Sequence, residues 1–222
     1  PATPAGTELA FVRSVTNESF RYRDAIAAAA DAAQNEAEYP AGRFGAELAA
    51  VAQMIKGRLG ARIYLVSLGS FDTHANQLGQ HAALLRQLGD GLAAFFDDLG
   101  ASGDDDRVLA MTFSEFGRRV EQNGSNGTDH GTSAPLFLAG PGVRGGLVGA
   151  PDLSALDAAG NLRYTTDFRS VYADVLTGWF GLSPAETQSV LGASYESVGL
   201  ISAPVATAAA PSPGFDLHPV TP

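Results

Sequence analysis

The feature that most constrains the fold is a strand–helix–strand pattern between residues 62 and 113. The segments 62-RIYLVSL-68 and 107-RVLAMTF-113 are short and apolar, which predicts two buried strands. Residues 77–99 between them carry leucine and phenylalanine at helical spacing. A helix of this length joins parallel strands through a right-handed crossover. We therefore expect an α/β fold with a mixed, mostly parallel sheet flanked by helices.

Further elements follow the same pattern. An amphipathic helix is predicted over residues 43–60, and another helix, with Asp167 as its N-cap, over 167–180. The motif 183-SPAE-186 is typical of a capping box with proline at the first helical position. Residues 117–134 are expected to form a long loop before a third strand, 135-PLFLAG-140. We interpret residues 1–201 as one α/β domain and residues 202–222, rich in Pro, Ala and Ser, as a tail or linker.

Composition excludes several classes of partner. The formal net charge of −10 disfavours nucleic acid, because phosphate binding needs clustered Lys and Arg. No run of about 18 apolar residues occurs, so no membrane span is expected. The chain has no cysteine, which excludes disulfides and thiolate metal sites.

Side chains that can bind a metal ion or transfer a proton lie next to the ends of the predicted strands. Asp72 and His74 come after the first strand, Glu115 comes after the second, and the pair Asp129–His130 precedes the third. In open α/β sheets, ligands bind outside the carboxyl ends of the strands. For His130 to share that edge, the third strand must run antiparallel to the second. Imidazole and carboxylate suit zinc, manganese or ferrous iron, so the pattern predicts a metal site.

Each of these residues also has a plainer interpretation. Asp72 is a candidate helix N-cap, and His74 a half-buried histidine that ties loops together. His81 is better explained as a packed residue that supports a ligand than as a ligand. Arg118 either pairs with Glu115, binds an anionic group of a substrate, or forms a surface ion pair.

Several blocks in this order resemble the DUF1501 family: 71-FDTHANQ-77, 114-SEFGR-118 and 127-GTDHG-131, with similarity over residues 1–195. The resemblance implies an exported bacterial protein, periplasmic or extracellular, related to the alkaline phosphatase and sulfatase superfamily. That superfamily places metal ions at the carboxyl edge of a mixed sheet and hydrolyses phosphate or sulfate esters. The expected cofactor is a divalent metal ion (zinc, manganese or calcium), and the expected substrate is a small anionic ester.

Carried over by position, the resemblance makes Asp72, His74, Glu115 and His130 the metal ligands. From the residues themselves, we expect Asp129, His81 and Arg118 to support these ligands or to contact the substrate. The superfamily's first strand and its nucleophile have no counterpart here. We therefore expect a C-terminal portion that needs a missing N-terminal portion or a partner subunit, and that hydrolyses esters slowly or not at all by itself. The alternative is a catalytically inactive, exported binding or assembly protein that keeps the fold.

Overall fold

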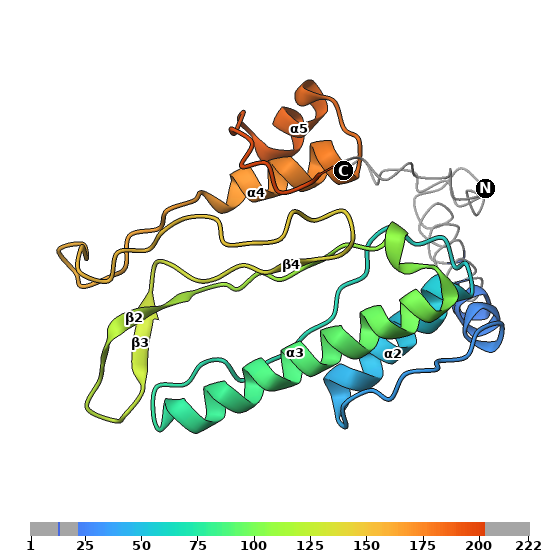
Figure 1. Ribbon diagram of the computed structural model, residues 1–222, viewed down its shortest axis with the longest axis horizontal. Helices are drawn as coiled ribbons and strands as arrows, with labels where there is room; N and C mark the ends of the chain where they lie inside the picture. The colour runs from blue at the N-terminus through green and yellow to red at the C-terminus, as the bar shows by residue number, and fades with distance from the viewer. Residues whose placement is uncertain (1–12, 14–21, 203–222) are drawn as a thin grey trace, which may run out of the picture. The chain divides into compact units, whose positions relative to one another are not determined.

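The computed structural model describes residue 13 and residues 22–202, which divide into two compact units (Figure 1). In the described part of the chain, the first unit contains residues 13, 22–67 and 90–104, and the second contains residues 68–89 and 105–202. The long helix α3 (Gln77–Ser102) contributes its first half to the second unit and its second half to the first. The predicted tail lies outside the described residues, apart from Ser202.

The core of the first unit lies between α2 (Arg43–Lys56) and the second half of α3. The apolar positions predicted for α2 are buried, as are two large side chains of α3: Phe44, Leu48, Val51, Ile55, Phe95 and Leu99. Gly91 allows the close approach of the two helices, because a Cβ atom there would lie 2.7 Å from the Phe44 ring. The helix predicted over residues 43–60 is thus confirmed, with its end at Lys56.

A buried carboxylate joins three segments of this unit. Asp98 Oδ1 accepts hydrogen bonds from Lys56 Nζ at 2.8 Å and from the backbone N–H of Glu36 at 2.7 Å. Its Oδ2 accepts one from the Tyr39 hydroxyl at 2.9 Å. The side chains of Lys56 and Asp98 are 7% and 0% exposed, so the ion pair is largely shielded from water. The hydrogen bonds from Lys56, Glu36 and Tyr39 therefore compensate the buried charge of Asp98 and tie their segments to α3.

The second unit contains two small antiparallel sheets. Strand β1 (Ala110–Met111) pairs with β4 (Leu138–Ala139), and β2 (Gly117–Gln122) pairs with β3 (Thr128–Gly131). A short 3-10 turn, η1 (Asp105–Arg107), precedes β1. The pairing of β1 with β4 confirms that the third predicted strand runs antiparallel to the second.

Two expectations about the sheet are wrong. Residues 62–68 form no strand, and Ile63 and Leu65 are 76% and 79% exposed, so no parallel pair forms with residues 107–113. An apolar, extended segment becomes a strand only when a neighbour supplies its hydrogen bonds and covers one face, and no described strand does so here. Residues 117–134, predicted as a loop, contain the β2–β3 hairpin instead. The result is a helix-and-strand fold with small antiparallel sheets.

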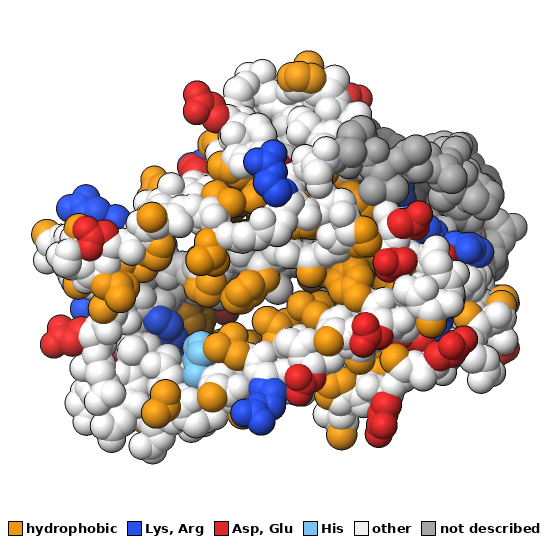
Figure 2. Space-filling model, in the orientation of Figure 1, with side chains coloured by type: hydrophobic (Ala, Val, Ile, Leu, Met, Phe, Trp, Pro, Cys, Tyr) orange, Lys and Arg blue, Asp and Glu red, His pale blue; other side chains and the backbone are white. Residues whose placement is uncertain are grey.

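The C-terminal helices confirm their predicted caps. Asp167 caps α4 (Phe168–Asp174) by accepting a hydrogen bond from Arg169 N, and a π-helical turn, η2 (Val175–Trp179), continues it. Helix α5 (Pro184–Leu191) begins with the capping box of Ser183 and Glu186. Among the described residues, no helix is long and apolar enough to cross a membrane. Hydrophobic side chains are visible at many places on the face shown in Figure 2.

Candidate metal centre

The loop at residues 71–76 lies against the turn of the β2–β3 hairpin. Ala75 forms an isolated β-bridge with Asn126, and Asn123 Nδ2 donates to the carbonyl oxygen of His74 at 3.0 Å. Glycine is required at position 127, because a Cβ atom there would lie 2.2 Å from the His74 carbonyl carbon. The turn chemistry of 123-NGSNG-127 therefore fixes the backbone of His74 beside the hairpin.

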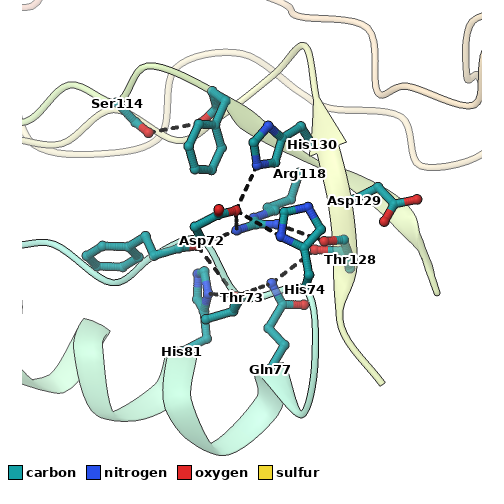
Figure 3. A network of polar contacts seen from close by, with 12 residues as sticks. Asp72, Thr73, His74, Gln77, His81, Ser114, Arg118, Thr128, Asp129 and His130 are labelled. Carbon is teal, nitrogen blue, oxygen red and sulfur yellow. Dashed lines mark hydrogen bonds and ion pairs between the residues drawn. The ribbon is translucent and has the colours of Figure 1, made fainter. Parts of the chain in front are cut away.

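Three predicted ligands meet at one oxygen atom (Figure 3). Asp72 Oδ1 lies 2.9 Å from His74 Nδ1 and 2.7 Å from His130 Nε2. One ligand atom from each residue lies within 4.8 Å of the other two. All three side chains are exposed, so the group is open to small molecules. The loop supplies Asp72 and His74, and strand β3 supplies His130.

The hydrogen bonds of this group define which nitrogen atoms face the shared centre. His130 Nε2 is hydrogen-bonded to Asp72 Oδ1, and His74 Nδ1 lies 2.9 Å from the same oxygen. These two nitrogen atoms are the ones that a metal ion at this point would bind, since metal-ligating imidazole nitrogens carry no proton. The hydrogen bond from His130 is the largest of the influences that hold the pKa of Asp72 below its ordinary value. Two imidazole nitrogens and an ionised carboxylate therefore face one point.

Arg118 holds the site together rather than facing solvent. Its guanidinium donates to Asp72 Oδ1 at 3.1 Å, to the Thr128 carbonyl oxygen at 2.7 Å, and to the carbonyl oxygen of Phe71. Arg118 also stands opposite His130 in the β2–β3 ladder. Of the roles predicted for Arg118, the structure gives it a carboxylate partner, but that partner is Asp72 rather than Glu115.

An aromatic ring fixes the orientation of His130. The rings of Phe116 and His130 are stacked, with centroids 3.9 Å apart and planes 7° apart. Phe116 comes directly before strand β2, whose residue Gly117 pairs with Gly131. The hairpin register thus places the stacked pair at one end of the ladder, beside Asp72.

A polar layer that the sequence interpretation missed lies beside the predicted ligands. The Gln77 amide nitrogen Nε2 donates to Thr73 Oγ1 at 2.9 Å and to Thr128 Oγ1 at 3.0 Å, which ties the loop to β3. His81 Nδ1 lies 3.3 Å from Thr73 Oγ1. Burial, followed by the charge of Arg118, lowers the pKa of His81, which favours the neutral ring. The position of Thr73 and Gln77 within 71-FDTHANQ-77 is the only signal the sequence offers for them.

Two predicted site residues lie apart from this group. Asp129 points away from the centre, as expected for the neighbour of His130 in a strand, and its Oδ1 accepts a hydrogen bond from Asn123 at 3.1 Å (Figure 3). Glu115 is exposed and is not a member of the three-residue group. The structure thus brings together three of the four predicted ligands, and it places His81 in contact with Thr73 beneath them.

We predict that Gln77→Ala weakens zinc or manganese binding by about tenfold, because supporting hydrogen bonds hold ligands in position. The substitution removes the link between Thr73 and Thr128 and leaves every ligand in place. Metal titration of the purified variant measures the effect. Gln80→Ala, one turn later on the exposed surface of α3, is the matched control and should bind like the wild type. Equal affinities for Gln77→Ala and the wild type would show that the polar layer does not position the ligands.

Fold and site together define a helix-and-strand protein with an exposed Asp–His–His group between a loop and a hairpin. Residues 5–189 match the family described as "Protein of unknown function (DUF1501)", and the chain belongs to that family. The family expected from the sequence blocks is therefore confirmed. No curated protein and no solved structure matches the chain.

Proposed function

We propose that this protein is a metal-dependent hydrolase of phosphate or sulfate esters, whose metal ion is held by Asp72, His74 and His130. The observation that carries the proposal is the convergence of these side chains on Asp72 Oδ1, although Asp72 and His130 are 58 positions apart in the chain. Such a convergence of imidazole and carboxylate from two separate segments is the arrangement that a transition-metal site requires.

The donor set supports a catalytic ion over a purely structural one. Three protein ligands leave coordination positions open, whereas structural zinc sites are closed by four. Exposure of all three side chains leaves those positions accessible to a substrate. Two imidazole nitrogens favour zinc or manganese, because calcium prefers oxygen ligands throughout.

A bound ion would supply Lewis acidity, which polarises a phosphoryl or sulfuryl oxygen. The protein's own contribution is positional. Arg118 orients the carboxylate of Asp72, and Phe116 orients the ring of His130. We further propose the alkaline-phosphatase-like relationship that the sequence blocks imply.

One observation favours a second candidate, a catalytically inactive binding or assembly protein. The hydroxyl of Thr73 has an imidazole partner in His81, but Thr73 is only 2% exposed. The hydroxyl of Ser114 is exposed, but it donates to the carbonyl oxygen of Phe116. Neither hydroxyl therefore combines access to substrate with an activating base, which covalent ester hydrolysis needs.

The test is hydrolysis of nitrophenyl phosphate and nitrophenyl sulfate with zinc or manganese supplied. We predict slow, metal-dependent turnover that falls by about tenfold or more in His74→Ala, because a metal ligand is lost. Asp129→Ala, whose side chain faces away from the group, should keep the wild-type rate. Stoichiometric metal binding without turnover of either ester would contradict the hydrolase and support the binding protein.

A further inference from the structure

A pocket of about 590 Å³ adjoins the metal-ligand group. Its walls come from residues 113–117, 131–136 and 164–172, all in the second unit. This volume lies in the range of small-molecule sites. The first two segments flank the β2–β3 hairpin, which also carries His130. A small molecule in the pocket would therefore lie next to the hairpin end of the site.

Two residues connect the pocket directly with the ligand group. Phe116 lines the pocket and stacks on His130, with ring centroids 3.9 Å apart. Gly131 lines the pocket and follows His130 in β3. The pocket thus begins at residues that contact or adjoin a metal ligand. A substrate whose reacting group reaches His130 would place its remaining part in this pocket.

The lining is rich in aromatic rings, which come from residues 113–117 and 164–172: Phe113, Phe116, Tyr164, Phe168 and Tyr172. Phe113, Tyr164 and Phe168 are exposed, so their rings are available to a ligand. Phe168 and Tyr172 are arranged edge to face, with centroids 5.3 Å apart. Aromatic walls of this kind bind planar rings and attract cations.

The charges of the pocket disfavour an anion there. Arg169, the one basic side chain among the described residues that line the pocket, donates to both oxygens of Asp167, at 2.9 and 2.7 Å. This bidentate pair offsets both charges. Glu115 lines the pocket and is exposed, and no residue in the described part of the chain hydrogen-bonds or ion-pairs with its side chain. One uncompensated carboxylate therefore faces an aromatic pocket.

We infer that this pocket binds an aromatic ring carrying a cationic substituent, with the ring among the aromatic side chains and the positive charge near Glu115. The inference rests on the proposed function for the identity of the substrate, an aryl ester whose anionic group faces the metal ligands. It also gives Glu115, predicted from the sequence as a ligand, a different role as the anchor of the substrate's cation.

The probes are tyramine and 4-hydroxyphenylacetate, which share a phenol ring and differ in the sign of the side-chain charge. Binding is measured by calorimetric titration with a chelator present, so the result does not depend on metal or turnover. We expect tyramine to bind at least about tenfold more tightly than 4-hydroxyphenylacetate. Phe168→Ala and Glu115→Gln should each weaken tyramine binding by about fivefold or more.

The control variant is Phe137→Ala. Phe137 is 47% exposed, close to the 56% of Phe168, but it does not line the pocket, so its loss should leave tyramine binding unchanged. Equal binding of the two probes, or full binding by Phe168→Ala, would overturn the inference. Tyramine binding, combined with a separate metal titration in which the chelator-free protein takes up no zinc or manganese, would leave the pocket assignment standing and refute the metal-dependent hydrolase. Metal-dependent ester hydrolysis without tyramine binding would refute the pocket assignment and leave the hydrolase standing.

Discussion

Replacing His130 with alanine should weaken binding of zinc or manganese by about 100-fold or more, since even the loss of a residue that supports a ligand costs 10- to 100-fold. The substitution leaves Asp72 and His74 as a two-residue remnant in an exposed site. Elemental analysis after dialysis, followed by metal titration, gives the content and the affinity. The expected result is close to stoichiometric metal in the wild type and little in the variant.

The control for this experiment is the next residue in the same strand. Asp129 points away from the ligand group and contacts Asn123, so Asp129→Ala should retain wild-type metal content. Truncation of the neighbouring side chain in the same strand controls for changes in hairpin stability. The site would be wrong if His130→Ala held as much metal as the wild type, or if both variants lost metal equally.

Asp98→Ala should lower the free energy of unfolding by about 3–5 kcal/mol, because it leaves the buried ammonium group of Lys56 without its counter-ion. The substitution also removes the acceptor of the Tyr39 hydroxyl and of the Glu36 backbone N–H. Urea denaturation followed by circular dichroism measures the difference. Asp97→Ala, the exposed neighbour on α3, should unfold at nearly the wild-type concentration of urea.

The pH dependence of stability gives a second readout for the same carboxylate. Burial raises the pKa of Asp98, but hydrogen bonds from Lys56, Glu36 and Tyr39 outweigh it and lower the pKa overall. A carboxyl group whose pKa is lowered on folding stabilises the protein above its unfolded value of about 3.9 and loses that contribution as pH falls. The gap in unfolding free energy between wild type and Asp98→Ala should therefore narrow below about pH 4. A gap that stayed constant from pH 7 to pH 3 would contradict this account of the ion pair.

Local patterns in the sequence predicted the helices well. Apolar residues at steps of three and four identified α2, and the caps at Asp167 and Ser183 marked where α4 and α5 begin. These features depend on neighbours within one or two turns of the chain. The convergence of Asp72, His74 and His130 was also expected, although the parallel-sheet argument that led to it is wrong.

Strand pairing was harder to predict, because it depends on partners far away in the chain. Residues 62–68 have the composition of a buried strand, but no strand in the described part of the chain pairs with them. Residues 117–131 are rich in Gly and Asn, yet they form a hairpin around a tight turn. The same turn brings Asn123 and Gly127 against His74. Glu115, expected among the ligands from its place after a strand, lines the aromatic pocket instead.

X-ray absorption spectroscopy of the zinc-loaded protein reports the atoms bound to the ion, and therefore tests whether Asp72, His74 and His130 hold it. We expect two imidazole nitrogens and a carboxylate oxygen at about 2.0–2.2 Å in the wild type. We expect one imidazole fewer in zinc-loaded His74→Ala. A protein that retains no zinc, or a bound zinc whose shell contains no imidazole, would contradict it.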